Sequence, residues 1–209
     1  MRFVSRDLCR TGFSTLCVAL VLGHAHADAA TVVLKKAFME KYKDRATIDT
    51  RFVVDHAKNS PNTIGRSGDD GDLHVAGRSP KGVGLPMVAE VINARMVPDV
   101  VTTLNALEGT DQSVPISGAW RLWFEHPAKT QQVQGKTVPP AKSTNPDHVF
   151  EIHPITELDG ADVRATFVEI PGYEAYDART AFGHYEKLKM TVQASGSGVQ
   201  INANRAVYN

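Results

Sequence analysis

Cysteine is scarce in this chain of 209 residues, where it occurs only at Cys9 and Cys17. Both positions fall within residues 1–27, which combine three arginines, the apolar run GFSTLCVALVLG and a small-x-small pattern ending at Ala27. This pattern is typical of a secretory signal peptide, so we expect cleavage near Ala27 and export to the periplasm or the extracellular space. The mature chain then contains no cysteine. Disulfides are excluded, and a hydrophobic core has to stabilise the fold.

Long apolar runs and net charge are also missing. The apolar run of the leader is about a dozen residues long, whereas a membrane-spanning helix needs ~20, and no later stretch is apolar enough. We therefore expect no membrane span in the mature chain. Removing residues 1–27 takes three Arg and one Asp from 23 basic and 23 acidic residues, which leaves a formal net charge of −2. Non-specific nucleic-acid binding is not expected, because it depends on basic residues at phosphates.

Signatures of nucleophilic catalysis are absent as well. The chain has no G-x-S-x-G nucleophile elbow and no glycine loop for phosphates, and no cysteine follows the leader. The expected partner is a small molecule, a glycan or a protein, and the sequence does not decide among these.

The apolar spacing predicts a mainly β fold with peripheral helices. Five strands, with a helix between the third and fourth and a long loop before the fifth, follow the order of an OB-like barrel. We therefore divide the mature chain into an N-terminal helix (28–45), a five-stranded OB-like barrel (46–158) and a C-terminal α/β extension packed on the barrel (159–209). The predicted elements are helices over 31–45, 98–109 and 174–188 and strands over 46–55, 72–78, 85–94, 113–126, 148–158 and 161–170, with two further strands near the C-terminus joined by a Ser/Gly turn.

The second predicted strand begins in a crowded polar stretch, GDDGDLHVAG, at residues 68–77. Side chains alternate across a strand, so Leu73 and Val75 point to one face, while Asp72 and His74 point to the other. The second, third and fifth strands of an OB barrel are neighbours. The same alternation therefore predicts that polar side chains of all three strands converge on the outer face, the usual OB ligand face. These residues are Asp72, His74, Glu90, Glu151 and His153.

Three interpretations of this polar group stay open. The leading one is a non-enzymatic, exported OB-like binding or accessory protein of unknown ligand, with His74, Glu90, Glu151 and His153 on the ligand face. The second is a metal-dependent hydrolase, phosphodiesterase-like or nuclease-like, in which Glu90 is the general base and a divalent zinc, manganese or iron ion is the cofactor. Its metal ligands would be Asp70, Asp72, His74, Glu151 and His153. In the third, the residues only stabilise the fold, since Asp-Gly-Asp before a strand is ordinary turn chemistry.

A second candidate patch lies in the stretch GAWRLWFEHP at residues 118–127. Trp120 has the spacing of a core residue, whereas Arg121 and Trp123 lie on the opposite face. An exposed aromatic ring beside a cation can stack on a sugar, a base or a peptide group. The alternative is that residues 160–209 cover this face and bury Trp123.

Four short elements along residues 46–158 resemble a group of small exported bacterial proteins with no activity known to us. The elements are Asp70-Gly71-Asp72-Leu73-His74, then Met87-Val88-Ala89-Glu90, then Gly118 with Glu125-His126-Pro127, and finally Glu151-Ile152-His153-Pro154. The resemblance implies an OB-like barrel. Asp70-Gly71-Asp72 also resembles the calcium-binding D-G-D of thermonucleases, which are secreted OB-fold enzymes. The D-x-P-E stretch that supplies their general base has no counterpart here, although Arg78 stands where an arginine would be expected.

Overall fold

The computed structural model describes residues 30–64, 70–124, 131–171 and 189–203, together with the single positions Arg179, Gly183 and Glu186. The predicted signal peptide over 1–27 lies outside these residues, as does most of the predicted helix over 174–188. Within the described residues, no helix is long and apolar enough to cross a membrane.

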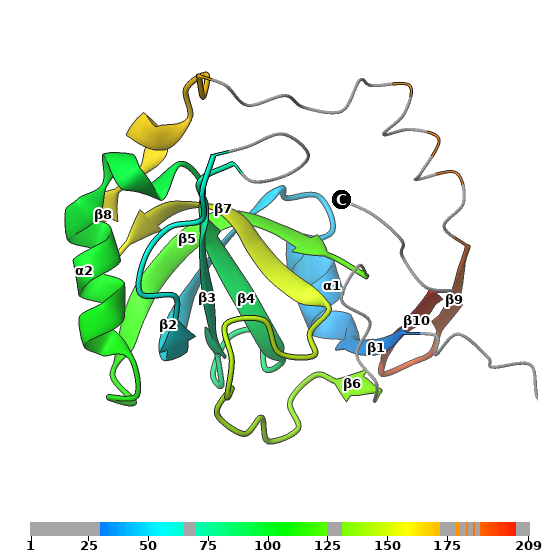
Figure 1. Cartoon of the computed structure of the whole chain (residues 1–209). Coiled ribbons are helices and arrows are strands. Elements are labelled where there is room, and N and C mark those ends of the chain that lie inside the picture. Colours follow the sequence, from blue (N-terminus) through cyan, green and yellow to red (C-terminus); the bar gives the residue numbers. More distant parts are fainter. Residues whose placement is uncertain are drawn as a thin grey trace, which may run out of the picture.

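The centre of the molecule is a closed, five-stranded barrel with the strand order of an OB-like fold (Figure 1). Antiparallel pairing runs in the order β4-β3-β2-β5-β7, and a parallel pairing of β4 with β7 closes the barrel. The mainly β, OB-like architecture predicted from the sequence is therefore confirmed. The barrel strands are β2 (Thr47–Ala57), β3 (Leu73–Arg78), β4 (Pro86–Val91), β5 (Ser113–Leu122) and β7 (Phe150–Leu158).

Alternating side chains fill the barrel interior, as expected for strands with one buried face. On β3 and β4, the side chains of Leu73, Val75 and Met87 belong to the apolar core and are fully buried. Close backbone approach also shapes the interior. A Cβ atom added at Gly77 would lie 2.2 Å from the carbonyl oxygen of Val53, so this position of β3 has no room for a side chain.

Two helices pack against the barrel, on opposite sides of the strands in the view of Figure 1. Helix α2 (Pro98–Leu107) has proline at its first turn and buries Leu104, in agreement with the predicted helix between the third and fourth barrel strands. Helix α1 (Lys36–Tyr42) places Phe38 against the aromatic rings of Trp120 and Phe150. The rings of Trp120 and Phe150 are stacked, with their centroids 5.8 Å apart.

The predicted helix over 31–45 is wrong in its first half, where the chain forms β1 (Ala30–Lys35). This strand alternates buried and half-buried side chains and pairs in antiparallel register with β10 (Gly198–Ala203). A strand partner so distant in the sequence leaves no local signal, while the apolar spacing of the following residues does fit a helix. Strands β9 (Met190–Ala194) and β6 (Gln132–Val133) complete a second sheet, of order β6-β1-β10-β9.

The prediction for the C-terminal residues is confirmed for two strands and corrected for a third. Strands β9 and β10 occupy the predicted pair of strands, and Ser195–Ser197 connects them. The predicted strand over 161–170 is reduced to β8 (Ala161–Asp162), after which the chain turns into the 3-10 helix η2 (Arg164–Thr166). A second 3-10 helix, η1 (Ala94–Met96), leads from β4 to α2.

Candidate functional site

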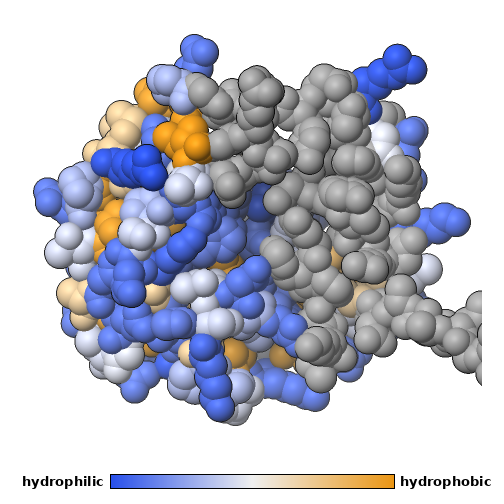
Figure 2. Space-filling model, in the orientation of Figure 1, coloured by the Kyte–Doolittle hydropathy of each residue, from blue (hydrophilic) through white to orange (hydrophobic). Residues whose placement is uncertain are grey.

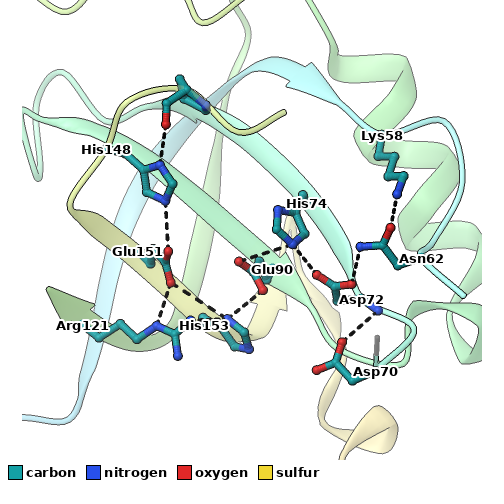
Figure 3. Close-up of polar contacts among 11 residues, drawn as sticks. Lys58, Asn62, Asp70, Asp72, His74, Glu90, Arg121, His148, Glu151 and His153 are labelled. Carbon is teal, nitrogen blue, oxygen red and sulfur yellow. Dashed lines mark hydrogen bonds and ion pairs between the residues drawn. The ribbon is translucent and has the colours of Figure 1, made fainter. Parts of the chain in front are cut away.

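The polar side chains predicted to share a face are brought together on the outside of β3, β4 and β7 (Figure 3). Two features of register place them there. His74 on β3 is directly opposite Glu90 on β4, and Glu151 on β7 is directly opposite Arg121 on β5. Because β4 also pairs with β7, the two cross-strand pairs become neighbours on one surface. We call the set Asp72, His74, Glu90, Glu151 and His153 the outer-face cluster.

The first half of the cluster is centred on His74. Its Nε2 atom lies 2.5 Å from Oδ2 of Asp72 and 3.7 Å from Oε1 of Glu90. The other oxygen of Asp72 accepts a hydrogen bond of 2.6 Å from the side-chain amide of Asn62, which in turn accepts from Lys58. The loop before β3 therefore holds the Asp72 carboxylate in a fixed orientation toward the imidazole.

The second half is centred on His153. Its Nδ1 atom lies 2.7 Å from Oε2 of Glu90 and 4.0 Å from Oε2 of Glu151. Arg121 borders this half, with Nε donating to Oε2 of Glu151 at 2.6 Å and Nη2 lying 2.8 Å from Nδ1 of His153. Glu90 is thus shared by both halves, since one of its oxygens faces His74 and the other faces His153.

His148 belongs to the same network, although sequence reasoning missed it. It precedes β7 and is almost fully buried, with 1% of its side chain exposed. Its Nε2 atom lies 2.9 Å from Oε1 of Glu151, and its Nδ1 atom lies 2.6 Å from the carbonyl oxygen of Pro146. The i,i+3 spacing of His148 and Glu151 in HVFEIHP was the available signal. Glu151 therefore has positive or hydrogen-bond-donating neighbours at both oxygens.

Burial and charge act in opposite directions on the ionisation of the cluster. Burial alone would lower the pKa of His74. The hydrogen bond to Asp72 and the charge of Glu90 outweigh it and raise the pKa of His74 to about 9. Burial alone would raise the pKa of Asp72 and of Glu151, but both carboxyls keep a pKa below their usual range. The hydrogen bond and charge of His74 lower the pKa of Asp72. The hydrogen bonds and charges of His148 and Arg121 lower the pKa of Glu151.

Asp70 lies beside the cluster rather than in it. One carboxylate oxygen accepts a hydrogen bond of 3.2 Å from the backbone N–H of Asp72, which is an Asx-type turn contact (Figure 3). Burial and the charge of Asp72 raise the pKa of the Asp70 carboxyl. Asp70 does not belong to either of the candidate metal-ligating groups described below, in contrast to the ligand role predicted for it.

Trp123 is buried, with 9% of its surface exposed, so it does not offer an open ring face for stacking on a ligand. The guanidinium of Arg121 instead covers its ring, at 4.1 Å from the ring centroid. Trp120 is half-buried and donates its indole N–H to the carbonyl of Arg45 at 2.8 Å. The predicted residues Glu125, His126 and Pro127 lie outside the described part of the chain.

No family model, curated protein or solved structure matches this chain. Two groups of side chains have ligand atoms that all lie within 4.8 Å of one another. One group is Asp72, His74 and Glu90, and the other is Glu90, Glu151 and His153. Both are sets of imidazole and carboxylate donors, which suit transition-metal ions.

Proposed function

We propose that this protein is an exported OB-like binding protein whose ligand is a divalent transition-metal ion of the zinc class, held on the outer face of the barrel. The observation that carries the proposal is the convergence of two imidazoles and three carboxylates from neighbouring strands and the loop before β3. Export of the chain is part of this proposal and depends on the signal-peptide pattern of residues 1–27.

The donor set favours zinc-class ions over calcium and magnesium. Calcium and magnesium prefer shells made entirely of oxygen, whereas each of the two groups contributes one imidazole nitrogen together with two carboxylates. Imidazole and carboxylate are common ligands of zinc, manganese and iron. Calcium binding of the thermonuclease type is disfavoured, because Asp70 is turned to the backbone of Asp72.

The partial exposure of the two histidine side chains makes the outer-face cluster accessible to an ion from solvent. The side chains of Asp72 and Glu90 are each 7% exposed, while those of His74 and His153 are 25% and 20% exposed. An ion can therefore enter past the imidazole edges and keep water in its remaining coordination positions. The buried carboxylates supply the negative charge that offsets its own charge.

The position of Glu90 argues against the general-base role predicted for it. Both of its carboxylate oxygens face imidazole nitrogens, Oε1 toward His74 and Oε2 toward His153. A general base needs an oxygen directed at the proton of a water or substrate. This geometry is better suited to a metal ligand, so binding is proposed here and hydrolysis is not.

The test is metal content and metal-dependent stability. The full chain is expressed with its own leader, recovered after export without a polyhistidine tag, and analysed by elemental mass spectrometry. We expect bound zinc, manganese or iron, and a rise in melting temperature when zinc is added to chelator-treated protein. His74→Ala should reduce both effects.

His56→Ala is the matched control for this test. His56 also contacts a carboxylate, with Nδ1 2.5 Å from Oε1 of Glu108, but it lies on β2 outside the outer-face cluster. The control variant should bind metal like the wild-type chain. A wild-type protein that is isolated without metal and shows no thermal shift with zinc, manganese, cobalt or iron(II) would refute the proposed function.

A further inference from the structure

The outer-face cluster has two metal-ligating halves that meet at a single carboxylate, and this inference rests on the metal-binding function proposed above. We infer that the site holds two ions, with Glu90 as the bridging ligand. The first ion is bound by Asp72, His74 and Oε1 of Glu90. The second is bound by Oε2 of Glu90, His153 and Glu151.

The membership of the two groups is the first argument for two ions. Zinc-class ions bind nitrogen and oxygen at about 2.0–2.2 Å, so two ligands of one ion lie at most about 4.4 Å apart. Within each group the ligand atoms nearly satisfy this limit, since all lie within 4.8 Å of one another. The two groups share Glu90 but are otherwise distinct, so one ion is not required to reach all five side chains.

The direction of the Glu90 oxygens is the second argument. Oε1 lies 3.7 Å from Nε2 of His74, and Oε2 lies 2.7 Å from Nδ1 of His153. A carboxylate that presents a different oxygen to each of two imidazoles has the arrangement of a bridging ligand. Paired ions in proteins lie about 3.5–4 Å apart, a separation that one bridging carboxylate can span.

The hydrogen bonds around His153 give a third, independent argument. Arg121 has only donors, and its Nη2 atom lies 2.8 Å from Nδ1 of His153, while Oε2 of Glu90 lies 2.7 Å from the same atom. One ring nitrogen either donates a single hydrogen or accepts a single one, so it cannot satisfy both close neighbours. A cation bound by Nδ1 and Oε2 would use the lone pairs of both atoms and would account for their close approach, and Arg121 Nη2 would then turn to an acceptor other than Nδ1.

The surroundings fix the two outer ligands of the proposed pair. Asn62 donates to Asp72 on one side, and His148 and Arg121 donate to Glu151 on the other. Such contacts orient the carboxylates that bind a metal and lower the entropy lost on binding. The two supports lie on different elements: Asn62 precedes β3, and His148 precedes β7.

The experiment counts ions in paired variants of the full chain. Chelator-treated protein is titrated with cobalt(II) and followed by equilibrium dialysis and by electron paramagnetic resonance. Wild-type protein should bind about two ions per chain, and the resonance signal per ion should weaken as the second ion couples to the first. His74→Ala and His153→Ala should each retain about one ion and an uncoupled signal, because each variant removes one half only.

Glu90→Gln should lose the coupling and weaken both ions, while His56→Ala should retain two coupled ions. Circular dichroism and thermal melts verify that each variant folds. If Glu90→Gln does not fold, the two histidine variants are sufficient for the test. His74 and His153 are partly exposed, so we expect their alanine variants to fold. One ion per chain, lost equally in both histidine variants, would overturn the inference and leave the proposed function intact. No bound cobalt would overturn the inference, and it would overturn the proposed function as well if the chain is isolated without metal and shows no thermal shift with zinc, manganese or iron(II).

Discussion

The elevated pKa of His74 predicts a specific pH dependence for the metal-free protein. The pKa is about 9 in the folded chain against an ordinary value of 6.5, because the Asp72 carboxylate accepts a hydrogen bond from the protonated imidazole, and Glu90 and Glu151 add negative charge nearby. A raised pKa means that the folded state favours protonated His74. The resulting stabilisation is fully present below pH 6.5 and is lost as the pH rises through 9.

The size of the effect follows from the two pKa values. A difference from 6.5 to about 9 corresponds to an upper limit between about 3 and 4 kcal/mol, at 1.36 kcal/mol for each pKa unit. Since the side chain of His74 is only 25% exposed, solvent screening reduces this figure modestly. We expect the free energy of unfolding to fall by about 1–3 kcal/mol between pH 6.5 and pH 9 through this residue alone.

Urea unfolding measures this contribution when wild-type protein is compared with His74→Gln, whose amide still donates to Asp72 but does not titrate. The chain has two tryptophans, Trp120 and Trp123, which report barrel unfolding by fluorescence. All samples contain a chelator, because a metal ion would displace the proton from His74. The free-energy difference between wild type and variant should shrink steadily from pH 6 to pH 9.5. A difference that stays constant over this range would refute the reasoning.

Three further predictions concern stability. Glu151→Gln leaves buried donors without their carboxylate and should cost about 3–5 kcal/mol in urea unfolding, whereas the exposed Glu157→Gln should cost less than about 0.5 kcal/mol; equal losses would contradict the ion-pair role. Gly77→Ala forces a Cβ to within 2.2 Å of the Val53 carbonyl oxygen and should lower the free energy of unfolding by at least about 1–3 kcal/mol. Its control is Gly196→Ala, whose added Cβ meets nothing within 4 Å and should leave the free energy of unfolding nearly unchanged. Free zinc at 100 times its dissociation constant should stabilise the chain by about 2.7 kcal/mol, and a chelator should reverse the shift; unchanged melting curves would argue against binding to the folded state.

The barrel could be predicted from the sequence because its signals are local. Alternation along each strand shows which side chains share a face, and the helix beginning at Pro98 fixes the order of elements. Once β3, β4 and β7 are taken as neighbours, the approach of His74, Glu90 and His153 follows without coordinates. The convergence of the site was predictable because it needs only strand order and side-chain parity.

Pairing between distant segments could not be predicted in the same way. The residues of β1 have apolar spacing that fits a helix, and their extended form depends on pairing with β10 and β6, which are both distant in the sequence. The sequence predicts only a long loop before the fifth barrel strand, yet this segment contains β6 and buries Gln132 and Gln134. Gln134 is held by hydrogen bonds to the backbone of Lys35 and Val83, and hydropathy does not detect burial of this kind.

The pairing of β1 with β10 has a consequence for the order in which the molecule assembles. It joins Ala30 to Ala203, whereas the five barrel strands all lie between residues 47 and 158. A chain synthesised from its N-terminus can therefore close the barrel before the antiparallel partner of β1 has been made. Before β10 is available, β1 has, among the described strands, only its short parallel pairing with β6, at Val32 and Val33, and helix α1 has its contacts with Trp120 and Phe150. The sheet of β6, β1, β10 and β9 can therefore be completed only after the barrel strands are in place.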